Sequence, residues 1–373
     1  AAPSDLYERS GRIITCSENH RTDAGTGCSV SLTIIENGIE TSDYEICPSF
    51  ADKMGSILSN YRVKMNETDS IVDMTMSTFR DCSERNCSFA LLGCAGAPNS
   101  CLIHCTTEDA FRQRSLSSVF QSMLQYTVSS LETIKSIRLY VNAIHNAKEI
   151  DLLAGDLFSK TAPKNDITVT SLLNCTFFTL HSYEALEESL LAAHRHFQSR
   201  HASIRYLFEH ITLDFLDAND HRCFSFHYVE IPREAMCSVP ANSTSEHRFA
   251  YDEVNSVLDC CVGMKEGSRV SCDTSFLVKC LHLNDSSEES AVHCVNLFMV
   301  CNYHDIITIA QSVSTAARNN APDEITEIAT VSAFSQSLSV YDSYQREVAN
   351  SKIASLQKQL MELKDLVSQL VIL

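Results

Sequence analysis

The amino-acid sequence predicts a mainly α-helical, disulfide-rich protein with minor β-hairpins and a long C-terminal coiled-coil helix. Three observations predict this class. The chain of 373 residues contains 17 cysteines, several long stretches carry apolar residues at helical spacing, and the last 25 residues show a leucine-zipper pattern. A chain of this length has room for two or three domains, each with its own core.

The composition is that of a folded protein, with 44% hydrophobic and 20% charged residues. The net charge of −18 argues against nucleic acid or an anionic membrane surface as a partner, because both would repel the chain. No run of about 18 apolar residues is present, so no segment is predicted to span a bilayer. The opening "AAPSDLYE" is typical of a mature chain after removal of a signal peptide.

The cysteines form two blocks of eight, from Cys16 to Cys105 and from Cys223 to Cys301, with Cys175 alone between them. They lack the paired spacing that zinc sites need, so the pattern predicts disulfides in a secreted, extracellular protein. Cys175 is the candidate for an unpaired or intermolecular cysteine. Five glycosylation sequons agree with secretion. They are Asn66, Asn86, Asn174, Asn242 and Asn284.

Four regions follow from this pattern: a disulfide-rich helical region with a β-hairpin (1–105), a helical middle (106–222), a second disulfide-rich helical region (223–321) and a C-terminal helix (322–373). In the first region, Asn37-Gly38 lies between two alternating segments and predicts the hairpin. The stretches 50–65 and 69–82 have helical spacing.

The middle region is predicted to hold a long antiparallel pair of helices. The first would run from Thr106 past Ile137, Val141 and Ile144, and the second from near Ser182 to Phe215. Segments 164–173 and 222–231 are predicted as short strands.

The second disulfide-rich region again shows helical spacing, at 250–261 and 286–313. Cys294 and Cys301 are seven residues apart, which predicts that they share one face of a helix. Cys260 and Cys261 are adjacent and should therefore bond different partners.

The C-terminal arm repeats apolar residues at alternating spacings of four and three. This pattern predicts a coiled coil of two or three copies of the chain, whereas the alternative is a helix that folds back onto its own domain. The predicted oligomerisation residues are Ala349, Ile353, Leu356, Leu360, Leu363, Val367 and Leu370.

The sequence contains no phosphate-binding loop, HExxH, G-x-S-x-G or dinucleotide pattern, so neither an enzyme activity nor a cofactor is predicted. His194 and His201 could share a helix face, which leaves metal binding or pH sensing as alternatives to ordinary surface histidines. Asp214, Asp217, Asn219 and Asp220 carry oxygen ligands for Ca²⁺ without the spacing of a calcium loop, which favours a solvated helix end.

The segment "CSFALLGCAGAPNSCLIHC", from Cys87 to Cys105, is small and apolar. It is predicted to be a tight disulfide loop, and the alternative is a loop that touches a membrane. With the sequons and the C-terminal coil, that alternative resembles the general plan of a trimeric viral fusion ectodomain. The candidate membrane-contact residues are Leu91, Leu92, Gly93, Ala95, Gly96 and Ala97.

These observations together predict a secreted, glycosylated, non-enzymatic structural or assembly protein. Its expected partners are copies of itself, as a dimer, trimer or larger assembly, and N-linked glycans. The alternatives are a viral or cell-surface fusion or attachment ectodomain, and a carrier of an apolar ligand.

Overall fold

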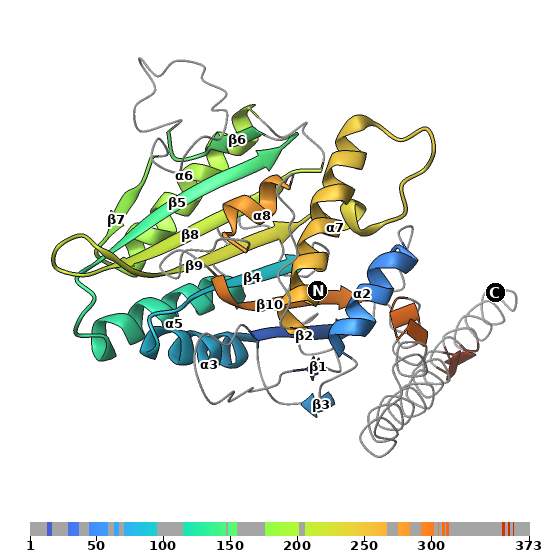
Figure 1. The fold of residues 1–373 in the computed structure, drawn as a ribbon, viewed down its shortest axis with the longest axis horizontal. Coiled ribbons are helices and arrows are strands. Elements are labelled where there is room, and N and C mark those ends of the chain that lie inside the picture. The colour runs from blue at the N-terminus through green and yellow to red at the C-terminus, as the bar shows by residue number, and fades with distance from the viewer. Residues whose placement is uncertain are drawn as a thin grey trace, which may run out of the picture. The chain divides into compact units, whose positions relative to one another are not determined.

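The computed structural model shows a mixed β-sheet covered by helices on both faces (Figure 1). Residues 1–316 and 317–373 form two separate units. The structure describes residues 13–16, 29–36, 45–58, 63–66, 71–94, 115–146, 148–154, 176–200, 206–266, 275–283, 292–301, 305, 308, 309, 311, 312, 353, 354, 357, 358 and 361.

The sheet has ten strands in the order β3-β1-β2-β10-β4-β9-β8-β5-β6, with β7 paired to β5. Its four central strands, β2, β10, β4 and β9, are parallel, and the pairs outside them are antiparallel. The strands are β1 (Ile13–Cys16), β2 (Ser29–Glu36), β3 (Val63–Asn66), β4 (Ser88–Cys94), β5 (Ser136–His145), β6 (Lys148–Asp151), β7 (Phe178–Leu180), β8 (Phe208–Leu216), β9 (Arg222–Ile231) and β10 (Val292–Cys301).

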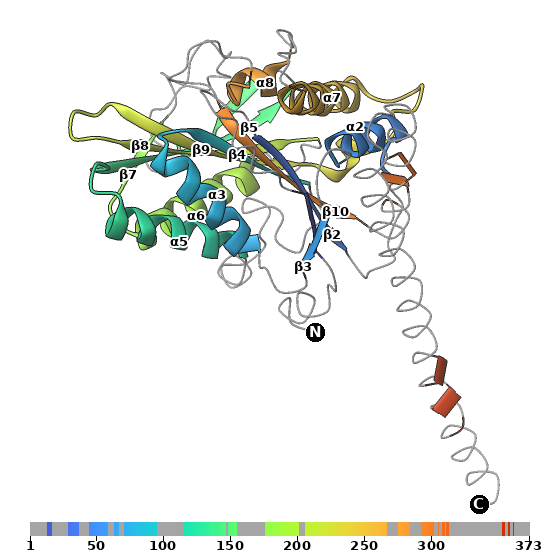
Figure 2. The same ribbon diagram turned by 60° about the horizontal axis from the view of Figure 1, so that its bottom comes forward.

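The helices lie in two layers, one on each face of the sheet (Figure 2). One layer holds α3 (Ile71–Glu84), α5 (Ser115–Ser130) and α6 (Tyr183–Arg200). The other holds α2 (Pro48–Leu58), α7 (Ser245–Lys265), α8 (Phe276–Cys280) and the short 3₁₀-helix η2 (Arg233–Met236). Because both faces are covered, nearly every residue of β8 and of β9 is buried.

Local sequence accounts for several of these boundaries. Helix α2 begins with proline, whose fixed φ angle suits the first turn of a helix. Helix α7 begins after Thr244, whose side chain accepts a hydrogen bond from the backbone N–H of His247. Three elements predicted from the sequence are confirmed: α3, α7 and β9. The helix predicted at 50–65 is confirmed only as far as Leu58, because residues 63–66 form strand β3.

The predicted mainly α-helical fold class is wrong, because both long helices of the middle region end early and continue as strands. The first gives way to β5 after Ser130, and the second to β8. Ile137 and Val141, like Ile211 and Phe215, are four residues apart. That even spacing places side chains on one face of a strand as well as on one face of a helix. The shortened helices α5 and α6 do contact each other, on one face of the sheet.

The predicted helix around Cys294 is also wrong, because residues 292–301 form β10, a parallel strand in the middle of the sheet. Successive side chains of a strand point to opposite faces, so the odd spacing of Cys294 and Cys301 places them on opposite sides. Of the predicted hairpin at Asn37-Gly38, the first strand is β2, which pairs with β1 and β10. Residues 37–44 and 164–173 lie outside the described part of the chain.

The predicted disulfides are wrong for the cysteines that can be examined. Nine of the described cysteines form no disulfide, including the adjacent Cys260 and Cys261 of α7. A large buried core replaces covalent bonds as the source of stability: 28 buried residues form one cluster between the sheet and α3, α5 and α6.

In the unit formed by residues 317–373, the five described residues are helical. Ile353, a predicted oligomerisation residue, has 53% of its surface exposed, and Met361 has 67% exposed. No coiled-coil contact is present among these residues, which contradicts that part of the predicted fold class. The other predicted oligomerisation residues, Ala349, Leu356, Leu360, Leu363, Val367 and Leu370, lie outside the described residues.

Candidate functional site

The chain changes sides of the sheet at the carboxyl ends of β4 and β9. These two strands are parallel neighbours. The next helix described after β4 is α5, and the next long helix after β9 is α7, and the two lie on opposite faces (Figure 2). In open α/β sheets, ligands bind outside the carboxyl ends of the strands at such a switch point. This position is therefore the first place to look for a site.

Gly93 brings the backbone of β4 close to β9 at this point. It lies opposite Glu230 in the strand register. A Cβ atom at position 93 would lie 3.2 Å from the hydroxyl oxygen of Tyr228 and 3.4 Å from Oε2 of Glu230. Glycine thus gives the two polar side chains room beside the strand.

Two buried carboxylates face each other across β8 and β9. Glu209 is paired with Glu230 in the antiparallel register, and their exposed fractions are 0% and 2%. The hydroxyl of Tyr228 donates a short hydrogen bond to Oε2 of Glu230. When both carboxyl groups are ionised they repel each other, so a cation bound here would stabilise that form of the pair. Gly93, Glu209, Tyr228 and Glu230 are called the carboxyl-edge site below.

An ion pair joins the segments that follow β9 and β10 beside this site. Arg233 of η2 donates to Oδ2 of Asp305, which is 1% exposed. Oδ1 of Asp305 accepts a 3.1 Å hydrogen bond from the backbone N–H of Ile46, just before α2. One buried carboxylate therefore links three segments that are distant in sequence.

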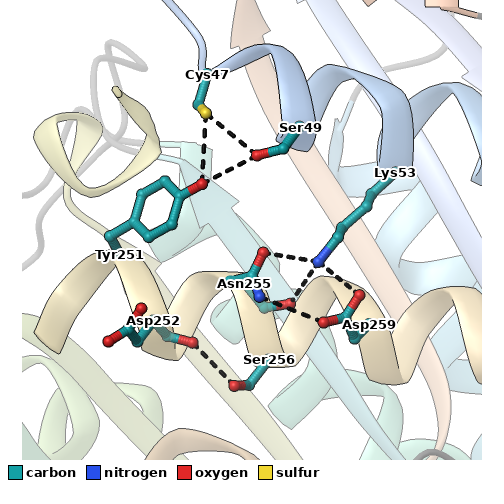
Figure 3. Close-up of polar contacts among 8 residues, drawn as sticks. All are labelled: Cys47, Ser49, Lys53, Tyr251, Asp252, Asn255, Ser256 and Asp259. Carbon is teal, nitrogen blue, oxygen red and sulfur yellow. Dashed lines mark hydrogen bonds and ion pairs between the residues drawn. The ribbon is translucent and has the colours of Figure 1, made fainter. Parts of the chain in front are cut away.

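A second polar cluster joins α2 to α7 (Figure 3). Nζ of Lys53 lies 2.5 Å from Oδ1 of Asp259 and donates a 2.7 Å hydrogen bond to Oδ1 of Asn255. Asn255 in turn donates to Oδ2 of Asp259 at 3.3 Å. These contacts fix the orientation of α2 against α7, which is a structural task.

Cys47 lies at the start of α2, beside two hydroxyl groups. Its sulfur is 3.2 Å from Oγ of Ser49 and 3.4 Å from the hydroxyl of Tyr251, and these two oxygens are 3.0 Å apart. Burial acts to raise the pKa of the Cys47 thiol, but hydrogen bonds from Ser49, Tyr251 and Ser238 outweigh it, so the pKa lies below its usual value. The position at a helix N-terminus favours a thiolate in the same direction.

The structure separates the residues that the sequence suggested as membrane-contacting. Leu91 and Leu92 are buried in β4, at 2% and 1% exposure, which leaves them almost no surface for a bilayer to contact. Gly93 belongs to the carboxyl-edge site, whereas Ala95, Gly96 and Ala97 lie outside the described residues. None of the helices described here combines the length and the apolar character that crossing a bilayer requires.

Among the predicted sequons, Asn66 ends β3, Asn86 lies in the turn before β4 with a φ angle of 50°, and Asn242 lies in a turn before α7. Asn174 and Asn284, and the predicted unpaired Cys175, lie outside the described residues.

The candidate metal ligands do not come together. The side chain of His194 and all of His201 lie outside the described part, and the described residues contain no group of three metal-ligating side chains. Asp214, Asp217 and Asp220 belong to the β8–β9 hairpin rather than to a helix end. Oδ1 of Asp217 accepts from the backbone N–H groups of Asn219 and His221, which closes the turn.

Comparison with known proteins gives matches in structure only. No protein-family model matches the chain, and no curated protein matches it. The Drosophila kinesin family member NOD, in complex with divalent manganese and ADP, is 14% identical and has a TM-score of 0.46, covering 79% of this chain and 98% of its own. The motor domain of Kar3 from Candida glabrata is 12% identical, with a TM-score of 0.41 and coverage of 71% and 85%. NOD docked into a map of its microtubule complex is 13% identical, with a TM-score of 0.45 and coverage of 80% and 100%.

The similar structures are kinesin motor domains, and one is described as a kinesin motor ATPase. The α/β sheet, together with nine described cysteines that form no disulfide, contradicts the functional expectations from the sequence. The prediction of a secreted, non-enzymatic assembly protein is wrong. The two alternative predictions, a fusion ectodomain and a carrier of an apolar ligand, are wrong as well. The predicted extracellular location is also wrong. So are the predicted partners, which were copies of the chain itself and N-linked glycans.

Sequence reasoning missed the carboxyl-edge site because its members are scattered along the chain. Only folding brings Glu209, Tyr228 and Glu230 beside Gly93. The available signal was the segment "FSFHYVE", a buried strand that ends in an acidic residue. A second signal was the run of small residues directly after another buried strand, from Gly93 to Ala97.

Proposed function

We propose that the chain binds a nucleotide together with a divalent cation at the carboxyl-edge site. The observation that carries the proposal is the position of Gly93 beside Glu230, at the point where parallel strands β4 and β9 lead to opposite faces of the sheet. Switch points of this kind bind nucleotides in open α/β folds.

The donor set suits a hard cation that arrives with phosphates. Mg²⁺ is usually held by one or two carboxylates plus substrate phosphates, so it does not need three protein ligands. Glu209 and Glu230 supply two carboxylates from paired positions, and Tyr228 orients Glu230 through its hydrogen bond. The bound cation would neutralise phosphate charge, which the net charge of −18 otherwise repels.

The sequence after β4 departs from the complete phosphate-binding pattern G-x-x-x-x-G-K-[ST]. Gly93 and Ser100 match its first and last positions, whereas Pro98 and Asn99 replace the second glycine and the lysine. The lysine contacts the β- and γ-phosphates in proteins that have it. We therefore expect weaker binding than a complete pattern gives, with a strict need for the cation.

Calorimetric titration of the full chain with ADP and Mn²⁺, the pair bound to the similar NOD structure, tests the proposal. Binding should disappear when the divalent cation is chelated, and Glu230→Gln should weaken it by about tenfold or more, because a charged ligand is lost. Glu266→Gln, an exposed change at the end of α7, is the matched control and should bind normally.

Absence of ADP binding, or equal binding with and without the cation, would overturn the proposal. Phosphate release from ATP, followed in the same samples with and without microtubules, extends the test from binding to hydrolysis. Circular dichroism of Glu230→Gln separates a lost ligand from a lost fold.

A further inference from the structure

Three cysteines gather at the amino ends of the parallel strands, at the opposite end of the sheet from the carboxyl-edge site. Cys82 lies in the last turn of α3, Cys87 directly precedes β4, and Cys294 lies near the start of β10. The backbone N–H of Cys87 donates a 2.9 Å hydrogen bond to the carbonyl oxygen of Cys82. The turn between α3 and β4 therefore holds two thiols close together beside a third.

Cys82 and Cys294 are neighbours although they are far apart in sequence. Both belong to the same buried cluster, and Cys294 is paired with Phe89, two residues after Cys87. Each side chain shifts the pKa of the other. The sulfur of Cys294 accepts a 3.1 Å hydrogen bond from Oγ of Ser29. Cys82 is 1% exposed and Cys294 is 7% exposed, while Cys87 is half-buried. Cys294 is therefore the more exposed of the two paired thiols.

The surroundings give the two sulfurs different roles. The hydrogen bond from Cys82 and that from Ser29 lower the pKa of the Cys294 thiol, although burial opposes them. The same contact with Cys294, followed by burial, raises the pKa of Cys82. Burial also raises the pKa of Cys87. A thiolate is the nucleophile in thiol oxidation, so Cys294 is the thiol that reacts first.

We propose that Cys294 and Cys82 form a peroxide-reactive thiol pair that closes to a reversible disulfide. The Cys294 thiolate attacks one oxygen of hydrogen peroxide, which breaks the O–O bond, yields a sulfenic acid and releases hydroxide. Cys82 then attacks the sulfenic sulfur, forms the S–S bond, and water leaves with its thiol proton. Two thiols are oxidised and one peroxide is reduced to water.

The bond proposed here forms on oxidation and is absent from the resting structure, where both cysteines are free. It differs in this respect from the permanent disulfides that the sequence predicted. Because Cys82 belongs to α3 and Cys294 to β10, closure would join the helix layer covalently to the centre of the sheet. The proposal does not depend on nucleotide binding, since the cluster and the carboxyl-edge site lie at opposite ends of β4.

Peptide mapping of the full chain after brief exposure to hydrogen peroxide tests the pair. We expect a joined peptide that contains Cys82 and Cys294, and its loss on treatment with a dithiol reductant. The thermal midpoint of unfolding should rise on oxidation and return on reduction, because a cross-link restricts the unfolded chain. Cys294→Ser should abolish the joined peptide.

Two variants keep the result interpretable. Cys82→Ser keeps a hydrogen-bond donor beside Cys294 but cannot close the disulfide, so sulfenic acid should accumulate on Cys294 and be captured by a cyclic 1,3-diketone probe. Cys261→Ala is the matched control: Cys261 is buried in α7, burial raises its pKa to about 12, and its removal should leave the joined peptide unchanged. A joined peptide with Cys87 in place of Cys82, or peroxide consumption that does not change in Cys294→Ser, would overturn the proposal.

Discussion

The two faces of the central sheet bury opposite kinds of side chain, although they belong to the same strands. Toward α3, α5 and α6 the packing is aromatic, and the ring of Phe79 lies 5.5 to 6.0 Å from four other rings. Toward α7 and α8, β8 and β9 present His210, Thr212 and His227, with Nε2 of His210 3.1 Å from Nδ1 of His227. Apart from the polar residues at its carboxyl edge, the aromatic face is held mainly by burial, whereas the other, polar face depends on protonation and hydrogen bonds.

The largest expected effect comes from the aromatic face. Phe79→Ala removes a fully buried ring from α3 and should lower the free energy of unfolding by about 3–5 kcal/mol. The loss should be the same at about pH 7.5 and about pH 5, because the contacting rings do not titrate in that range. Urea unfolding at both pH values measures it. Phe79→Leu, which keeps most of the volume, should cost much less, and a strongly pH-dependent loss would contradict the comparison.

A fall in pH should reduce the stability contributed by the polar face of the sheet but not that contributed by the aromatic face. Burial and the nearby His282 lower the pKa of His210 from 6.5 to about 4, and burial also lowers that of His227. The unfolded chain therefore binds protons first, so the stabilisation is complete above about pH 6.5 and is lost as the pH falls toward about 4. For His210 alone, the free energy of unfolding is expected to fall by about 3 kcal/mol over this pH range.

Unfolding free energies measured across this pH range check the sign and the size. His221→Ala changes a histidine of the exposed β8–β9 turn and should retain the full pH dependence. His210→Gln should flatten the curve, and an unchanged curve in that variant would assign the acid sensitivity elsewhere.

Glu253 provides a third test, confined to the helices over the polar face. Its carboxylate accepts hydrogen bonds from Oγ of Ser275 at 2.8 Å and from the backbone N–H groups of Phe276 and Leu277 at 3.0 and 2.6 Å. Glu253→Gln should cost about 1–3 kcal/mol, because an amide replaces a charged acceptor at the start of α8. Chemical denaturation measures it, and Glu266→Gln, which changes an exposed glutamate, should have almost no effect.

The smallest expected effect is at the beginning of α7. The side chain of Thr244 accepts a 3.2 Å hydrogen bond from the backbone N–H of His247. Thr244→Ala should lower stability by about 1 kcal/mol, and Thr244→Ser should restore most of it, because serine caps a helix equally well. Thermal unfolding of the two variants measures the difference. Equal stability of the two variants would show that the cap contributes nothing.

The spacing of apolar residues explains which of these elements the sequence could predict. Helices α3 and α7, and α2 as far as Leu58, were predicted correctly because each carries an apolar stripe with polar residues opposite. Strands β5 and β8 were mistaken for helix because residues four apart, such as Ile137 and Val141, also fit a helical period and continue the apolar stripe of the preceding helix. The alternation that marks a strand is present in β5, where apolar side chains at 137, 139 and 141 alternate with polar ones at 138, 140 and 142.

The candidate site was beyond sequence reasoning for a different reason. Glu209 and Glu230 become a pair only through the antiparallel register of β8 and β9, and Gly93 joins them only because β4 lies parallel to β9. Neither the strand register nor the strand order can be inferred from the spacing of residues along the chain. The cysteine count was misleading for a similar reason, because the sequence does not distinguish a thiol that packs as a small apolar group from one that forms a disulfide.

The position of β10 has a consequence for how the chain folds as it is synthesised. It is the last strand in the sequence, yet it lies between β2 and β4 and connects β1, β2 and β3 to the rest of the sheet. While the ribosome is still translating the middle of the chain, β2 has no neighbour on that side and its backbone groups are open to other chains. Pairing must wait for residues 292–301, and contacts between such distant segments form slowly. A nascent chain arrested before Val292 should therefore remain protease-sensitive in its first three strands and need chaperone protection there.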